Sequence, residues 1–359
     1  MNQCPKRKEP LKMWQWNKRV VTGLAAVFLG ITMVLTGCNT AKTEDKDKKE
    51  KTQAAPKSIL PLDTSSKKVI GEYQNGKVTE GELHRFLNLM GFLDPQIDMF
   101  LSSPQAKEQL NGLKEDALKQ YTTRQYILSK AKPADQYNKK IEDEMKKIED
   151  MMKQNPTPQA TGNEKAPKNL DEAIKGKGFT KDEFRAFVLD DLRIADYLDE
   201  QLKKQEYDHV KVNHILVSFT QKDAQPMPGQ PNRSEADAKK RIEEVKKKLD
   251  QGGDFAKLAK EYSDDPGSKD KAGLVEGPAD QFVPEFAKAA KTIPLNQISD
   301  IVKTEYGFHI LKVTERKKQT MDKAPDQFKG QQRQKVFTEI MDKEVKLKSL
   351  LPKEQPAKK

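Results

Sequence analysis

The chain has 359 residues and a formal net charge of +11. Residues 1–37 hold six basic side chains and one acidic side chain, a net of +5, so the remainder carries +6, the difference between +11 and +5. In that remainder acidic and basic residues are mixed, and no basic run is interleaved with aromatic residues, which argues against nucleic-acid binding. A chain of this length is long enough to form two folded domains.

The N-terminus has the three parts of an export signal. A basic leader is followed by an uncharged, mostly apolar stretch from Val20 to Thr36, which ends in the sequence Leu35-Thr36-Gly37-Cys38. This last sequence resembles the lipobox of bacterial lipoproteins, which implies cleavage before Cys38 and attachment of lipid to its thiol. The alternative is an uncleaved anchor, because about 17 apolar residues approach the length that spans a bilayer.

Cysteine content agrees with the lipoprotein prediction. Cys4 lies in the leader, so the cleaved chain would keep one cysteine and form no internal disulfide. Stable attachment needs more than one acyl chain, and the resemblance implies two or three on Cys38. We therefore predict a signal peptide over 1–37, a polar, flexible tether over 38–67, and a lipid anchor at the extracytoplasmic face of the cell membrane.

Residues 68–207 are predicted to be mainly helical. Residues 69–73 read as a strand, and Thr79 with Glu82 forms a capping box that opens a helix. Further helices are indicated by apolar spacing or by high charge around 110–121, 133–152 and 184–198.

A helix within 317–350 also has one apolar stripe. Neither this segment nor 68–207 has enough partner surface alone, so the two are predicted to form one domain. A polar tail follows over 351–359.

Residues 208–316 have a different pattern, which predicts a compact α+β domain inserted between the helical segments. Alternating apolar residues indicate strands over 210–216 and 308–314, with the side chains of His214 and His309 directed inward. Three helical segments lie between these strands.

Four motifs in this domain resemble the parvulin family of prolyl isomerases. They are, in chain order, Val212-Asn-His214-Ile-Leu-Val, Phe255-Ala-Lys-Leu-Ala-Lys-Glu-Tyr-Ser263-Asp-Asp-Pro-Gly-Ser268, Gln281-Phe-Val-Pro-Glu-Phe286 and Tyr306-Gly-Phe-His309-Ile-Leu. The order of lipobox, helical region, parvulin domain and C-terminal helix is similar to the PrsA foldase lipoproteins of Gram-positive bacteria. The resemblance implies a four-stranded antiparallel sheet with helices, inserted in a helical chaperone domain that is often dimeric, so a homodimer is allowed.

The activity implied by the resemblance is cis–trans isomerisation of X-Pro bonds in unfolded or newly exported polypeptides. Rotation about this bond is slow because its partial double-bond character gives a barrier of about 20 kcal/mol. Lowering that barrier requires an apolar grip on proline, exclusion of water and a preference for the twisted amide. Neither a metal nor another cofactor is needed, and the sequence has no residue spacing typical of a metal site.

The resemblance assigns four catalytic positions, His214, Asp265, Thr304 and His309. Inward histidines are often ordinary core residues, and even here the pair could order the site through an imidazole hydrogen bond without transferring protons. Asp265 corresponds to the family position beside the reacting carbonyl, and it could equally be a turn residue before Pro266.

The resemblance assigns the proline pocket to three residues, Leu274, Phe282 and Phe286. Ordinary core packing is the alternative for all three. Active members of the family usually read Gly-Gly-Asp-Leu-Gly-Trp-Phe where this chain has Ala272-Gly273-Leu274-Val275-Glu276-Gly277. Because Val275 takes a positive φ less easily than glycine, we expect a reshaped pocket floor. His84 and His209 match no motif and are expected to be solvated.

Two other functions fit parts of the pattern. A parvulin domain whose altered 272–277 loop has lost turnover would leave a holdase chaperone with a binding cleft. A solute-binding lipoprotein would need two lobes of alternating strands and helices, which the charged helices of this chain do not show. Cis–trans exchange of a proline tetrapeptide separates the isomerase from the holdase.

Overall fold

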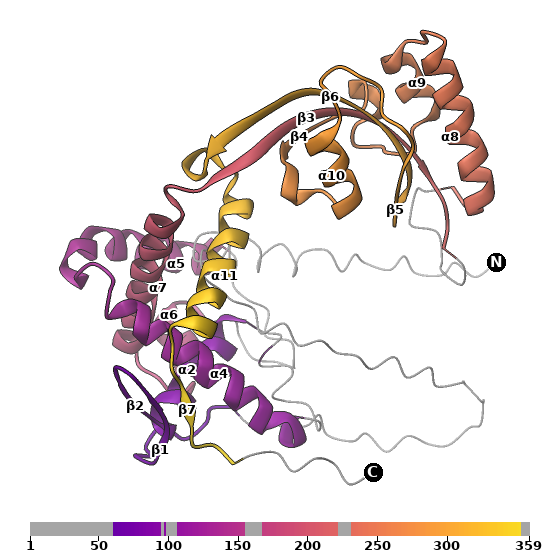
Figure 1. Cartoon of the computed structure of the whole chain (residues 1–359). Helices are drawn as coiled ribbons and strands as arrows, with labels where there is room; N and C mark the ends of the chain where they lie inside the picture. Colours follow the sequence, from indigo (N-terminus) through magenta and orange to yellow (C-terminus); the bar gives the residue numbers. More distant parts are fainter. Residues whose placement is uncertain (1–59, 95–96, 98–105, 155–166, 222–230, 353–359) are drawn as a thin grey trace, which may run out of the picture. The chain divides into compact units, whose positions relative to one another are not determined.

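The computed structural model describes residues 60–94, 97, 106–154, 167–221 and 231–352. They divide into two compact units (Figure 1). The helical unit contains residues up to Gln201 together with those from Gln332 onward, and the sheet unit is Leu202–Gln331. The sheet unit extends beyond the predicted 208–316 at both ends, because its two longest strands already pair at Glu206 and Thr320.

Most of the helical unit is made of six helices: α2 (Glu80–Leu93), α4 (Ala106–Leu128), α5 (Asn138–Gln154), α6 (Leu170–Ile174), α7 (Lys181–Leu202) and most of α11 (Asp326–Lys343). The 3-10 turn η1 (Ala134–Tyr137) precedes α5. The predicted capping box is confirmed, since the Glu82 N–H donates to Thr79 Oγ1 at 3.3 Å and the Thr79 N–H donates to Glu82 Oε2 at 2.7 Å. Behind this cap, Leu83 and Leu87 are fully buried.

The last helix completes a hydrophobic cluster begun by two earlier helices. Phe337 and Ile340 of α11 pack with Ile127 of α4 and with Ile194 and Leu198 of α7. Segments more than 130 residues apart along the sequence therefore share one core.

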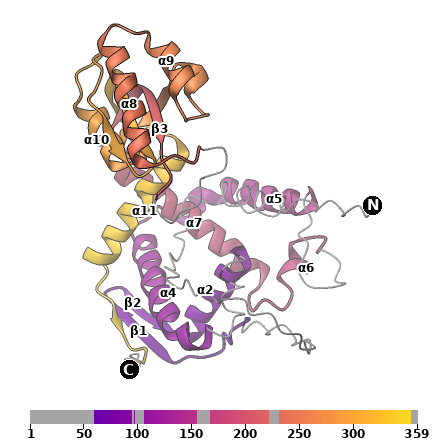
Figure 2. The same cartoon turned by 90° about the vertical axis from the view of Figure 1, so that its right-hand side faces the viewer.

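The helical unit also contains a small antiparallel sheet, in the order β2 (Gly76–Thr79), β1 (Val69–Tyr73), β7 (Lys348–Ser349). Helices α2 and α4 lie beside β1 and β2 (Figure 2). The C-terminal segment is therefore more than one helix: β6 (Gly307–Thr320) and η4 (Met321–Lys323) precede α11, and β7 follows it. Pairing of β7 uses backbone bonds, which side-chain periodicity does not reveal.

Residues 60–67, assigned from composition to the flexible tether, lie against α2. The Leu62 N–H donates to Asn88 Oδ1 at 2.8 Å, and Asn88 Nδ2 donates to the Leu62 carbonyl at 3.0 Å. His84 is buried rather than solvated, because its Nδ1 lies 2.6 Å from the Asp63 carbonyl. The predicted signal peptide, Cys38 and the rest of the tether lie outside the described residues.

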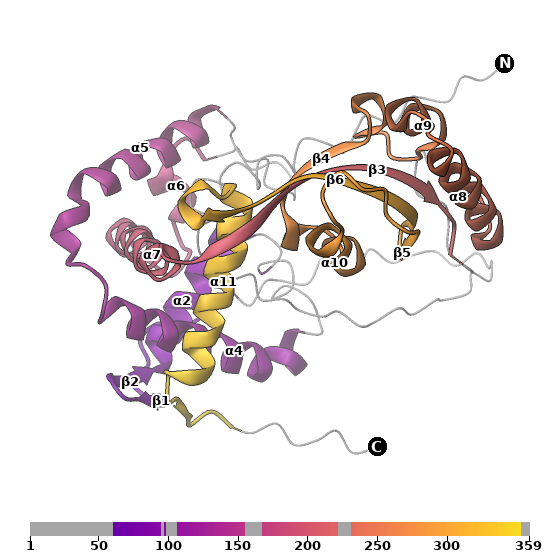
Figure 3. The same cartoon turned by 45° about the horizontal axis from the view of Figure 1, so that its top comes forward.

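The sheet unit confirms the predicted four-stranded antiparallel sheet. Its order is β4 (Leu274–Pro278), β3 (Glu206–Ser218), β6, β5 (Val302–Thr304). Helices α8 (Glu235–Asp250) and α9 (Phe255–Tyr262) pack on one face, and α10 (Pro284–Thr292) packs on the other (Figure 3). Neighbouring residues of a strand point to opposite faces, so Ile310 packs under α8 and Leu311 under α10.

Candidate active site

Two buried histidines lie at the centre of the sheet unit, one on each central strand. His214 of β3 is 6% exposed and His309 of β6 is 5% exposed. Their Nδ1 atoms are 3.4 Å apart and their rings are nearly parallel, with an interplanar angle of 21°. The strand alternation that predicted inward side chains therefore brings the two imidazoles into contact.

A carboxylate lies at one end of this pair. Asp265 Oδ2 is 3.0 Å from His214 Nε2, and Asp265 Oδ1 accepts the Gly267 N–H at 3.0 Å. The Ser268 hydroxyl also donates to Asp265 Oδ2. The hydrogen bond from His214 lowers the pKa of Asp265 far below its ordinary value, although burial acts in the opposite direction. Asp265 is therefore a fixed negative charge at neutral pH, and its side chain remains 26% exposed.

A hydroxyl lies at the other end. Thr304 Oγ1 is 2.9 Å from His309 Nε2 and accepts the Tyr306 N–H at 3.1 Å. The four positions assigned by resemblance thus form one continuous chain, Thr304–His309–His214–Asp265.

The proton positions in this chain follow from its acceptors. Nε2 of His214 faces carboxylate Oδ2, so this nitrogen carries a proton. In a neutral imidazole, Nδ1 of His214 then accepts the Nδ1–H of His309, and Nε2 of His309 accepts the Thr304 hydroxyl proton. With this assignment, each hydrogen bond from Thr304 to Asp265 is donated in the direction of the carboxylate.

Aromatic side chains of the sheet unit cover the histidines. The Phe286 ring is 5.4 Å from the His214 ring and 5.5 Å from the His309 ring, and it is nearly perpendicular to both. Phe282 lies 4.9 Å from Phe286. These contacts bring two of the three predicted pocket residues to the histidine pair.

Leu274, the third predicted pocket residue, is placed differently. It is 40% exposed and is not part of the cluster that contains Phe286. The next residue of β4, Val275, packs against that cluster, so Leu274 points to the opposite face of the strand.

In the 272–277 loop, the residues with positive φ are not those that the sequence comparison suggested. Val275 lies within β4, and the positive φ angles belong to Ala272 at 57°, Gly273 at 73° and Gly277 at 152°. A Cβ on Gly273 would lie 2.1 Å from the His214 carbonyl oxygen, and the Gly273 carbonyl accepts the His214 N–H at 2.8 Å. The premise that Val275 occupies a left-handed position is therefore wrong. That position is taken by Ala272, where a residue other than glycine costs about 1 kcal/mol.

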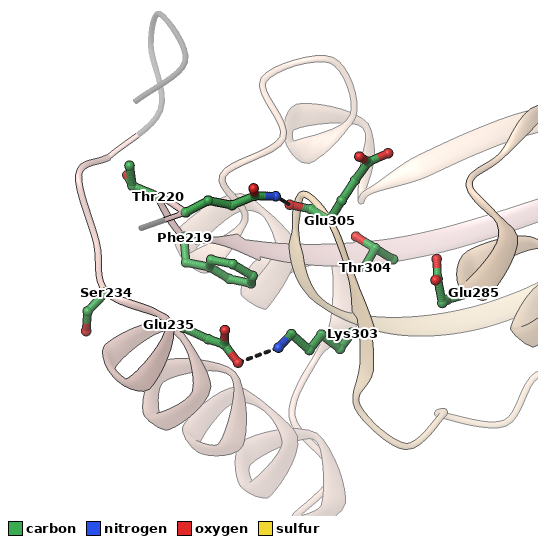
Figure 4. A pocket seen from close by; sticks show the side chains of 9 residues that line it. Phe219, Thr220, Ser234, Glu235, Glu285, Lys303, Thr304 and Glu305 are labelled. Carbon is green, nitrogen blue, oxygen red and sulfur yellow. Dashed lines mark hydrogen bonds and ion pairs between the residues drawn. The ribbon is translucent and has the colours of Figure 1, made fainter. Parts of the chain in front are cut away.

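A pocket of about 700 Å³ borders the histidine chain through Thr304 (Figure 4). An ion pair crosses it, with Lys303 Nζ 2.5 Å from Glu235 Oε1. Its lining residues are Phe219, Thr220, Gln221, Ser234, Glu235, Glu285, Lys303, Thr304 and Glu305.

Sequence analysis did not predict the surroundings of two residues near the sheet, His209 and Ser268. His209 was expected to be solvated, but its side chain is 12% exposed and its Nε2 lies 3.4 Å from Glu276 Oε1. Ser268 belongs to a recognised motif, but nothing in the sequence distinguishes its hydroxyl from that of any turn serine.

Within the described ranges, no group of three or more His, Cys, Asp or Glu residues could hold a metal ion.

The buried histidine pair predicts a pH-dependent stability. Burial lowers the pKa of His309 to about 3, and His214 acts in the same direction. A histidine in the unfolded chain titrates near 6.5, so between these values the unfolded state binds a proton that the folded state does not. The free energy of unfolding should therefore fall as the pH falls from about 6.5, by up to about 1.4 kcal/mol per pH unit.

Urea unfolding of the full chain at pH 4.5, 5.5 and 6.5 measures this slope. Asp265, whose pKa is lowered, stabilises the fold above its unfolded value of about 3.9 and loses that contribution only below it. Over pH 4.5–6.5 the slope should therefore be smaller in His309→Gln than in wild type. Equal slopes in the two proteins would contradict the prediction.

Known proteins resemble both the sheet unit and a larger part of the chain. Residues 198–317 match the family model of the PPIC-type PPIase domain. The foldase protein PrsA of Clostridium botulinum (strain Hall) is 32% identical over 262 residues, which cover 68% of this chain and 74% of that protein. The crystal structure of peptidylprolyl isomerase (PrsA) from Bacillus anthracis matches with 25% identity and a TM-score of 0.35, covering 63% of this chain and 90% of that one. From the domain match and the extent of the Clostridium relationship, the chain belongs to the PrsA foldase family and is a peptidyl-prolyl cis–trans isomerase.

Proposed function

We propose that X-Pro bonds isomerise at the exposed edge of Asp265, with the proline ring held by Phe282 and Phe286. The observation that carries this proposal is the continuous chain from Thr304 to Asp265. It leaves the carboxylate 26% exposed while donors fix both of its oxygens. Phe286 lies against both histidines, so an apolar surface and a fixed charge occur together.

This arrangement favours a twisted amide over a planar one. Resonance in the planar amide places partial negative charge on the carbonyl oxygen, and rotation removes it. A carboxylate beside that oxygen raises the energy of the planar form more than that of the twisted form. Exclusion of water by the aromatic rings acts in the same direction, because water stabilises the more polar planar amide.

Asp265→Asn is expected to lower turnover by about tenfold or more, equivalent to about 1.4 kcal/mol in the barrier. Asparagine keeps the size of the side chain and one acceptor oxygen, so the fold should hold, with a lower melting temperature because one of the donors around Asp265 loses its acceptor. The measurement is cis–trans exchange of a proline tetrapeptide by the full chain. Unchanged exchange in this variant would leave Asp265 only a role in the turn.

A holdase function that does not need turnover is the second candidate, and the altered 272–277 loop is the observation that favours it. This function predicts slow exchange in wild type, together with suppression of client aggregation that Asp265→Asn retains. Measuring both activities on wild type and Asp265→Asn separates the two candidates, since only an isomerase loses exchange while keeping aggregation suppression.

We further propose that the two units are separate domains, with the helical unit as the chaperone part. The shared cluster of α4, α7 and α11 supports this proposal. The proposed clients are polypeptides that have just crossed the membrane, because the leader has the features of an export signal.

We also propose that lipid on Cys38 holds the protein at the extracytoplasmic face of the cell membrane. The Leu-Thr-Gly-Cys sequence supports this location. Across the part of the chain that the structure describes, the helices are too short or too polar for any to span a bilayer.

Cys38→Ala is expected to abolish lipid attachment and to leave an uncleaved precursor. The wild-type protein should sediment with membranes and have the mass of a chain that begins at a lipid-modified Cys38. Mass spectrometry of the protein purified from cell membranes makes this measurement. A wild-type mass that retains residues 1–37 and lacks lipid would show the anchor proposal to be wrong.

A further inference from the structure

Ser268 does not use its hydroxyl as a serine at its position ordinarily does. It is the N-cap residue of the 3-10 turn η2 (Lys269–Lys271), where a serine side chain usually accepts a backbone N–H from the following turn. No such side-chain bond is made here. Ser268 is only 1% exposed, so its hydroxyl must find partners inside the protein.

Those partners are the Asp265 carboxylate and the His214 imidazole. Ser268 donates its proton to Asp265 Oδ2, because an ionised carboxylate can only accept. Its oxygen lies 3.1 Å from His214 Nε2, and that nitrogen lies 3.0 Å from the same Oδ2 atom. The Nε2–H of His214 therefore faces two acceptor oxygens.

We propose that Ser268 is a positioning residue of the isomerase site: its hydroxyl fixes the direction of the Asp265 carboxylate and gives the Nε2 proton of His214 a second acceptor. This inference rests on the proposed role of Asp265. Because the hydroxyl of Ser268 bonds Asp265 and His214, Ser268 acts through these two residues.

The backbone of Ser268 holds the same turn and is independent of the hydroxyl. Its carbonyl accepts the N–H of Lys271 at 2.8 Å and that of Gly273 at 2.9 Å, and Gly273 in turn accepts the His214 N–H. A change of the Ser268 side chain to alanine retains all of these bonds. Ser268→Ala therefore removes the hydroxyl contacts while the connection between the turn and β3 remains.

Ser263 provides a matched control within the same segment. It is also buried, at 6% exposed. Its hydroxyl oxygen accepts the N–H of Leu216 at 3.2 Å and that of Asp265 at 3.3 Å, but it bonds neither the carboxylate nor an imidazole. Ser263→Ala should lower the melting temperature and leave the proton of His214 in place.

The experiment uses the full chain labelled with ¹⁵N-histidine, together with tetrapeptide exchange kinetics. The sequence has four histidines, and a His214→Gln variant identifies the resonances of His214. In wild type, Nε2 should give the shift of a protonated nitrogen and Nδ1 that of an unprotonated one. Ser268→Ala should shift the Nε2 resonance, because its proton loses one of two acceptors and the carboxylate loses a donor, and should lower kcat by about 3- to 10-fold with KM unchanged, the effect of one hydrogen bond.

Ser268→Cys should fall between wild type and Ser268→Ala, because a thiol is a weak donor. Wild-type nitrogen shifts and kcat in Ser268→Ala, with only a lower melting temperature, would overturn the positioning role. Failure of the proposed function has a different signature. In that case Asp265→Asn keeps its turnover, while the nitrogen shifts of His214 still report whether Ser268 contacts its Nε2 proton.

Discussion

Phe286→Ala is expected to lower the free energy of unfolding by about 3–5 kcal/mol and to weaken substrate binding as well. Phe286 is 3% exposed, and its ring lies against both histidines and Phe282. Truncation removes buried apolar surface and leaves a cavity beside the imidazoles. The same ring is the proposed grip on proline, so KM for a proline tetrapeptide should rise.

Phe328→Ala is the matched control for this prediction. Phe328 belongs to the same unit, is 2% exposed, and packs 5.3 Å from the ring of Tyr207, in a contact that includes neither His214 nor His309. Its truncation should cost a similar free energy of unfolding and leave KM unchanged. Chemical unfolding and exchange kinetics, both at a temperature well below the melting point, make the comparison. If both variants raise KM equally, Phe286 is ordinary core.

Breaking the buried ion pair of the helical unit is expected to be equally costly. Arg124 and Asp191 join α4 to α7 with an Nη1–Oδ1 distance of 2.5 Å, and their side chains are 9% and 8% exposed. The guanidinium lies 4.6 Å from the Phe187 ring centre. Asp191→Leu would leave a guanidinium that cannot lose its proton buried without a counter-charge, a cost of about 3–5 kcal/mol.

A double variant separates the charge from the packing. In Arg124→Met/Asp191→Leu both charges are replaced by apolar groups, so most of the lost stability should return. Thermal melting of the two variants measures this difference. Equal destabilisation would show that shape, rather than an unpaired charge, is responsible. Tetrapeptide exchange should persist in Asp191→Leu after the helical unit has melted, since the proposed isomerase residues all lie in the other unit.

Elements with a strong side-chain period could be predicted from the sequence. Alternation placed His214 and His309 on inward faces of two strands, and antiparallel pairing of those strands brings the rings together. The capping box of Thr79 and Glu82 could also be predicted, because its hydrogen bonds join residues only three positions apart in the sequence.

Features that depend on tertiary contacts could not be predicted in this way. Strand β7 has two residues and pairs by its backbone, and residues 60–67 look like a polar tether until α2 supplies partners. In the site, the family resemblance assigned Leu274 to the proline pocket. Gly273 lies against the backbone of His214, and in the strand that follows, Val275 rather than Leu274 faces the Phe286 cluster. The hydroxyl of Ser268 acquires its role only when the turn folds back onto β3.

The pairing of β7 with β1 bears on the order in which the two units of the chain can fold. Strand β1 lies between β2 and β7, and the Leu350 N–H donates to the Ile70 carbonyl at 2.8 Å. In a chain synthesised from its N-terminus, β1 therefore lacks one of its two neighbouring strands until residues 348–349 have been added. The inserted sheet unit, whose contacts lie between residues 202 and 331, is complete earlier. The sheet unit can therefore fold before the helical unit, whose two segments flank it in the sequence.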